Sequence, residues 1–66
     1  MRLKIDKESD ALYFRLDESA IVESEEIRPG LILDFGKEGR AIGVEFFGIK
    51  ARVSEQELSS LQFQTN

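Results

Sequence analysis

The sequence predicts an α+β domain in which a five-stranded antiparallel meander is followed by one short C-terminal helix. Short runs rich in Ile, Val, Leu and Phe alternate with polar or glycine-containing breaks, which is typical of antiparallel strands joined by turns. A helix-capping pattern stands near the C-terminus. The 66 residues leave room for one domain. We divide it into a sheet core over residues 1–53, a helix over residues 54–61 and a tail over residues 62–66.

The first two strands follow from strict alternation. In residues 1–6 and 11–16 every second side chain is apolar, which predicts two half-buried strands. The polar residues 7–10 are expected to form the turn between them. A four-residue loop makes Lys4 face Tyr13 and keeps the apolar side chains together. A one-residue slip would turn those side chains to water, so we expect this register to be firm.

Residues 21–27 form the third and weakest strand candidate, because three glutamates interrupt the β-forming residues. Charged strands are typical of sheet edges, where charge discourages unwanted pairing. Pro29 and Gly30 end the strand, since proline lacks a backbone donor and glycine permits the turn. The acidic run could equally attract a basic protein partner. The residues expected to dock that partner are Glu23, Glu25 and Glu26.

The strongest β pattern covers residues 31–35 and 41–47, which are predicted to form the central hairpin. A three-residue loop ending in Gly39 fits a type I turn closed by a left-handed residue. In the resulting register Asp34 and Glu45 fall on opposite faces, and both faces are largely apolar. We therefore expect the hairpin to be covered on both sides. The residues expected on the helix-covered or self-associating face are Ile32, Ile42, Gly43, Val44 and Phe46.

A short helix is expected over residues 55–61. Ser54 and Glu57 have the spacing of a capping box, and Val53 and Leu58 have the spacing of a hydrophobic staple. The segment is too short to be a stable helix in isolation, so we expect it to dock on the sheet.

Composition narrows the function classes. The chain has no Cys and no His, and its net charge is −4. We therefore expect no disulfide, no metal, no cofactor and no cysteine nucleophile. Negative charge argues against nucleic-acid binding, and no apolar run has the roughly 20 residues of a membrane span. With no hydrophobic signal segment at the start, we expect a cytoplasmic protein. So short a chain usually needs added stabilisation, and self-association as a homodimer is the remaining means.

Three features leave alternatives open. Asp6 and Asp10 flank the first turn, where they either bind a hard cation or cap backbone amides; we favour capping. Gly43 weakens the strongest strand unless something needs the space, and we favour close approach of the helix or of a second subunit. A basic and aromatic patch on the first hairpin could clasp single-stranded nucleic acid, although the overall negative charge favours a merely solvated face. That patch consists of Arg2, Lys4, Tyr13 and Arg15.

With these residues placed, the chain resembles domain-of-unknown-function family 2283, a family of small bacterial and archaeal proteins. The resemblance extends over about residues 1–50, with departures at Ser9 and Gly36. The residues that carry it are Asp6, Asp10-Ala11-Leu12-Tyr13-Phe14, Pro29-Gly30, Leu33-Asp34, Gly39-Arg40 and Ile42-Gly43-Val44-Glu45-Phe46. It implies a small β-rich domain without an assigned activity. Some relatives are encoded beside small toxin-like proteins, which implies an antitoxin-like or partner-binding role.

Taken together, these features predict a non-catalytic, self-associating module that binds another protein. A different class remains open, namely a carboxylate-based enzyme or small-ligand domain with its site at a dimer interface. The only acids inside the hairpin pattern are Asp34 and Glu45. We expect both to have a structural role, each accepting hydrogen bonds on its own face.

Overall fold

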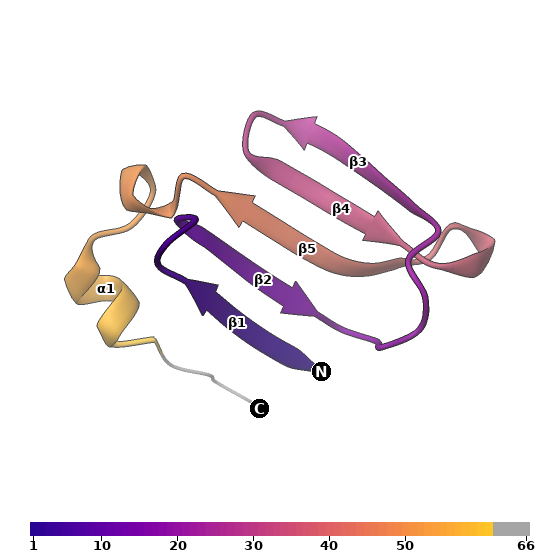
Figure 1. Ribbon diagram of the computed structural model, residues 1–66, viewed down its shortest axis with the longest axis horizontal. Coiled ribbons are helices and arrows are strands. Elements are labelled where there is room, and N and C mark those ends of the chain that lie inside the picture. The colour runs from indigo at the N-terminus through magenta and orange to yellow at the C-terminus, as the bar shows by residue number, and fades with distance from the viewer. Residues whose placement is uncertain (62–66) are drawn as a thin grey trace, which may run out of the picture.

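The computed structural model describes residues 1–61, which form one antiparallel sheet and a short C-terminal helix (Figure 1). The helix is α1 (Glu55–Ser59), and 3-10 turns cover Lys37–Gly39 and Ile49–Ala51. The expected strands are confirmed to within two residues at each end, and the predicted tail lies outside the described residues. The strands are β1 (Arg2–Asp6), β2 (Ala11–Arg15), β3 (Glu23–Arg28), β4 (Leu31–Phe35) and β5 (Ala41–Phe47).

The strand order is β1-β2-β5-β4-β3, so the prediction of a simple meander was wrong. After β2 the chain crosses the end of the sheet to its far edge and returns through β4 and β5 (Figure 1). An inner strand pairs on both sides, and β5 is the longest and among the most apolar of the five. A meander would have put acidic β3 in the middle and β5 at an edge. The expectation that the charged strand lies at an edge is confirmed.

Two arginines of the predicted basic patch hold the connection between β2 and β3. The Nε of Arg15 donates to the carbonyl of Asp17 at 2.7 Å, and its Nη2 donates to the carbonyl of Ser19. Arg2 forms an exposed ion pair with Glu18 at 3.2 Å. These guanidinium groups therefore stabilise the crossover, a role that a turn between neighbouring strands would not require.

The hairpin registers agree with the sequence in one case and differ in the other. Lys4 lies opposite Tyr13 as predicted. Between β4 and β5 only Phe35 has its predicted partner, because an irregularity follows Asp34 and shifts the remaining pairs by one residue. Both Glu38 and Gly39 are left-handed, with φ of 66° and 71°. The loop thus has two left-handed residues where the expected turn had one. A β-bulge accommodates the residue of β5 that is left without a partner on β4.

This shift sorts the side chains into one apolar and one polar face, because neighbouring strand residues point to opposite sides. The prediction that both faces of the central hairpin are apolar was therefore wrong. The apolar face consists of Leu3, Ile5, Leu12, Phe14, Leu31, Leu33, Val44 and Phe46. The polar face carries Lys4 and Tyr13 from the first hairpin and Asp34 and Glu45 from the second.

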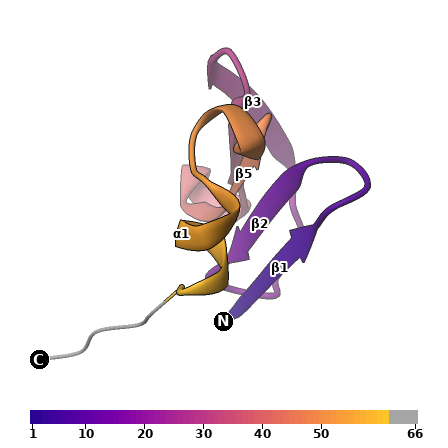
Figure 2. The same ribbon diagram turned by 90° about the vertical axis from the view of Figure 1, so that its left-hand side faces the viewer.

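Helix α1 lies on one side of the sheet and at one end of it (Figure 2). Val53 and Leu58, the predicted staple, line the same cavities as Ile5 and Phe46 of the apolar face. Arg52 holds the segment before α1 in place, because its Nη2 donates a hydrogen bond to the carbonyl of Pro29 at 2.8 Å. The helix consequently covers only one corner of the apolar face.

The helix begins as the capping pattern predicted, with Ser54 Oγ accepting a hydrogen bond from the backbone N–H of Glu57 at 3.1 Å. Ser54→Ala removes this acceptor and is expected to lower the free energy of unfolding by about 1 kcal/mol. Urea denaturation measures the effect. Ser59→Ala, at the last residue of the same helix, is the matched control. Equal unfolding midpoints for Ser54→Ala and the unsubstituted chain would contradict the prediction.

Candidate functional site

The most unusual group on the polar face is the side chain of Asp34 in β4. It is 3% exposed, and it is the buried charged residue of the described part of the chain. Burying a carboxylate is costly unless it is hydrogen-bonded. Ser24 of β3 supplies one bond, because its hydroxyl donates to Asp34 Oδ1 at 2.6 Å. The candidate site is therefore anchored to the edge strand by a serine that sequence reasoning did not select.

Gly43 of β5 makes room for this carboxylate. A Cβ atom built on Gly43 would lie 3.3 Å from Asp34 Oδ2 and 3.3 Å from Arg15 Cδ. The Asp34 side chain thus lies over the backbone of β5 at Gly43, the residue with which Asp34 pairs in the sheet. Close approach of the helix or a second subunit was the expected use of this space. Instead, two side chains of the neighbouring strands occupy it.

Asp34 and Glu45 lie on the same face of the sheet as a pair of carboxyls, so their assignment to opposite faces was wrong. The one-residue shift puts Glu45 opposite Ile32, on the same side of the sheet as Asp34. The hydrogen bond to Asp34, then partial burial, and then the negative charge of Asp34 together raise the pKa of Glu45 to about 7. Two adjacent carboxylates resist ionising together. Glu45 therefore keeps its proton well above the pH at which an ordinary glutamate loses it.

A cavity of about 310 Å³ opens over this pair. Tyr13 lies opposite Glu45 on β2, and its ring packs edge-on against Phe47 with centroids 6.1 Å apart. Arg2, Lys4 and Arg15 also line this cavity. A carboxyl that loses its proton near neutral pH, as Glu45 does, has the chemistry of a general acid or base. Among residues 1–61 no three acidic side chains are grouped closely enough to hold a metal ion.

The fold keeps the predicted basic patch together on the polar face, and all four of its residues line the cavity over the carboxyl pair. Arg2 and Arg15 are engaged by the crossover connection, as described above, and Lys4 and Tyr13 border the Asp34–Glu45 carboxyl pair. The patch thus shares its cavity with three acidic side chains, those of Asp6, Asp34 and Glu45. This mixture of charge does not resemble the positive groove that follows a nucleic-acid backbone.

Asp6 and Asp10 cap backbone amides, the favoured interpretation of their spacing. Asp6 Oδ1 accepts from the N–H groups of Glu8 and Ser9 at 3.1 and 3.3 Å. The backbone hydrogen bond from Ser9 is the main cause that lowers the pKa of Asp6. Asp10 Oδ1 accepts from the N–H of Lys50 at 3.1 Å, which joins the first turn to the segment after β5.

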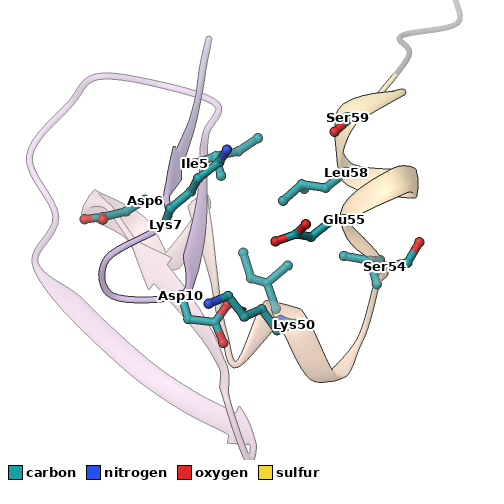
Figure 3. Close-up of a pocket in the computed structure, with 11 residues that line it drawn as sticks. Ile5, Asp6, Lys7, Asp10, Lys50, Ser54, Glu55, Leu58 and Ser59 are labelled. Atoms are coloured by element: carbon teal, nitrogen blue, oxygen red, sulfur yellow. Dashed lines mark hydrogen bonds between the residues drawn. The ribbon is translucent and has the colours of Figure 1, made fainter.

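A second cavity, of about 440 Å³, lies between that first turn and helix α1 (Figure 3). Ile5 and Leu58 approach each other from the strand and the helix, and Asp10 and Lys50 lie at the opposite end. The walls combine apolar side chains with charges of both signs. This cavity marks where α1 meets the sheet, and the carboxyl pair lies elsewhere.

The predicted docking residues all lie on β3, and every residue of that strand is exposed. They do not share one face. Glu23 and Glu25 are opposite Phe35 and Leu33, whereas Glu26 is opposite Ile32. Glu26 also accepts a hydrogen bond from the Gly30 N–H at 3.2 Å. The pair Glu23 and Glu25 thus borders the apolar face.

The five residues expected on a covered face are also separated. Val44 and Phe46 belong to the apolar face, whereas Ile32 and Gly43 lie on the polar side. Ile42, at the bulge, is 6% exposed. Sequence reasoning selected Asp34 and Glu45 singly but did not predict that they lie together. The signal that could have indicated their pairing was Gly43, a glycine inside the strongest strand.

These features define a class: a small antiparallel sheet with one apolar face, one polar face bearing a carboxyl pair, and a short helix at one end. The family model described as "Protein of unknown function (DUF2283)" matches residues 2–50, and the chain belongs to this family. The resemblance drawn from the sequence is confirmed. No curated protein and no solved structure matches the chain. None of the helices in residues 1–61 has the length and apolar character needed to cross a membrane.

Proposed function

We propose that this domain is a non-catalytic module that binds another protein along the edge strand β3. The observation that carries the proposal is the position of β3 at the end of the sheet order with all six residues exposed. An edge strand presents unpaired backbone donors and acceptors on its outer side. An extended segment of a partner can add to such an edge as a further strand. The antitoxin-like role implied by the family resemblance is one form of this function.

Charge indicates the kind of partner. Glu23 and Glu25 are exposed on the outermost strand, and the net charge of the chain is −4. Negative side chains at a docking edge attract a basic partner and raise its association rate. A partner strand can pair with β3 over a limited length only, because a register irregularity follows Glu26 and Pro29 stands just beyond the strand. A basic segment of about four residues is the expected ligand of this edge.

The test is a charge reversal at the edge. Glu23→Lys together with Glu25→Lys should slow association with a co-purified basic partner by at least about tenfold at low salt. The difference should shrink at high salt, because the Debye length shortens to about 3 Å at 1 M. Stopped-flow association rates at both salt concentrations measure the effect.

A second double variant separates edge charge from net charge. Glu8→Lys with Glu55→Lys makes the same change in net charge, at exposed residues of the first turn and of helix α1 rather than of β3. It should associate nearly as fast as the unsubstituted chain. Equal slowing by both double variants would contradict docking at β3. Charge used only to protect the edge predicts no partner in any native lysate.

A second candidate function is a carboxylate-based enzyme or small-ligand domain. The Asp34–Glu45 carboxyl pair favours it, because a titratable pair with a raised pKa in a cavity is typical of catalytic sites. Such perturbed groups also occur in purely structural networks. Failure of any protein to co-purify would favour this candidate over the binding module.

A further inference from the structure

The cavity over the carboxyl pair is basic on one side and acidic on the other. Its cationic side chains come from β1 and β2, and the carboxyl pair comes from β4 and β5. The register fixes this separation, because Lys4, Tyr13 and Glu45 lie in one row across three neighbouring strands. A parallel row has Arg15 on β2 and Asp34 on β4, with β5 between them. Opposite charges therefore face each other across the cavity.

The charges that line this cavity nearly balance. Three cationic and three acidic side chains are present, and the third acid is Asp6 at the end of β1. The N–H groups of Glu8 and Ser9 already hold the Asp6 carboxylate in the first turn. A ligand with a large net charge of either sign would be repelled by one side of the cavity. A ligand that carries one charge of each sign would be attracted by both sides.

The carboxyl pair has no compensating cation within residues 1–61. The hydrogen bond with Asp34, burial and the charge of Asp34 raise the pKa of Glu45, and no positive group counteracts them. Arg15 lines the same cavity but directs its Nε and Nη2 to the carbonyls of the crossover connection. A positive group from outside the chain would therefore supply the charge that the pair lacks.

The opposite end of the row is also without an ionic partner. The Arg2–Glu18 contact is the ion pair formed within residues 1–61, so Lys4 has none there. Its ammonium carries three donors, which suit a carboxylate. Tyr13 stands between Lys4 and Glu45, and a phenol hydroxyl both donates and accepts hydrogen bonds. The row thus offers donors at one end and an acceptor at the other.

We infer that this cavity binds a small zwitterion, an α-amino acid, with its ammonium on Glu45 and its carboxylate on Lys4. The nitrogen and the carboxylate carbon of an α-amino acid are about 2.5 Å apart. A charged hydrogen bond of about 2.8 Å at each end extends this span to about 8 Å. Lys4 and Glu45 are two strand spacings apart, about 10 Å, and the flexible lysine stem closes the difference. A cavity of about 310 Å³ is at the small end of ligand sites, as this ligand requires.

This site rests on the second candidate function, that of a small-ligand domain, and names its ligand class. It does not depend on partner binding at the edge strand, because no residue of β3 lines the cavity. The inference can therefore be tested on the purified chain alone.

Three probes separate the two charges of the ligand. Alanine carries both charges, N-acetylalanine keeps only the carboxylate, and alaninamide keeps only the ammonium. In NMR titrations of the isotope-labelled chain at about pH 7, alanine should bind at least about tenfold more tightly than either blocked form, because each blocked form loses one charged hydrogen bond. The amide signals that shift should belong to β1, β2 and β5 and not to α1.

Two variants assign the two ends of the ligand. Glu45→Gln should weaken the binding of alanine by about tenfold or more without weakening that of N-acetylalanine. Lys4→Gln should weaken the binding of alanine without weakening that of alaninamide. The matched controls are Glu8→Gln and Lys37→Gln, which are exposed and lie outside the cavity. Both should bind alanine as the unsubstituted chain does.

The comparison of probes uses the unsubstituted chain, so it decides the matter even if a variant fails to fold. Binding of one blocked form as tightly as alanine would overturn the zwitterion and leave a small-ligand site that recognises a single charge. Shifts at α1 in place of the carboxyl pair, or no shift up to about 50 mM alanine, would overturn the site itself. Docking of a basic partner at β3 is decided separately, by its association rates.

Discussion

The free energy of unfolding is expected to fall as the pH rises from about 4.5 to about 7, owing to the Asp34–Glu45 carboxyl pair. The pKa of Glu45 is about 7 in the folded chain, against an ordinary value of 4.5. Between these values the folded state holds a proton that the unfolded state has released. The stabilisation is fully present below pH 4.5 and is lost as the pH rises through 7. A shift of this size corresponds to about 3 kcal/mol, which solvent screening of a partly exposed group reduces to about 1–2 kcal/mol.

Glu45→Gln is expected to remove this pH dependence. The glutamine amide can donate to Asp34 at any pH, so no repulsion develops above pH 7. The variant should match the unsubstituted chain near pH 4 and exceed its stability at pH 8 by about 1–2 kcal/mol. Denaturation at a series of pH values measures this. Glu8→Gln, on the exposed first turn, should keep the original pH slope. An unchanged slope in Glu45→Gln would contradict the raised pKa of Glu45.

Gly43→Val is expected to be among the most damaging single substitutions in the sheet. Even a Cβ atom at this position would lie 3.3 Å from Asp34 Oδ2 and from Arg15 Cδ. Valine adds two methyl groups, so the Asp34 carboxyl must move away from Glu45 or β5 must shift. Overpacking of this kind costs about 1–3 kcal/mol. Chemical denaturation should therefore show a lower midpoint, together with a weaker pH dependence than in the unsubstituted chain.

Ala41→Val is the control on the same strand, because Ala41 is exposed and valine favours β-structure. It should change the stability by less than about 0.5 kcal/mol. Equal effects at positions 41 and 43 would indicate general intolerance of the strand to branched side chains. A tolerated Gly43→Val would contradict the role of Gly43 as space for the Asp34 carboxylate.

The local structure of this protein was determined by the sequence itself. Alternation in residues 1–6 and 11–16 specified both strands and the pairing of Lys4 with Tyr13, because a slip would expose every apolar side chain. Ser54 specified the start of α1 through a hydrogen bond that spans only three residues. These features depend on neighbours in the chain, so composition and spacing were sufficient to predict them.

The strand order and the carboxyl pair were decided only in the tertiary structure. The sequence indicated that β5 is strongly apolar and β3 acidic, but their relative positions depend on which strand gains two partners in the sheet. The β4–β5 register depends on a bulge beside Ile42, and that single residue moved Glu45 to the face of Asp34. Both outcomes arise from competition between long-range pairings. Local patterns contain no information about that competition, because a register and its neighbour one residue away satisfy nearly the same local preferences.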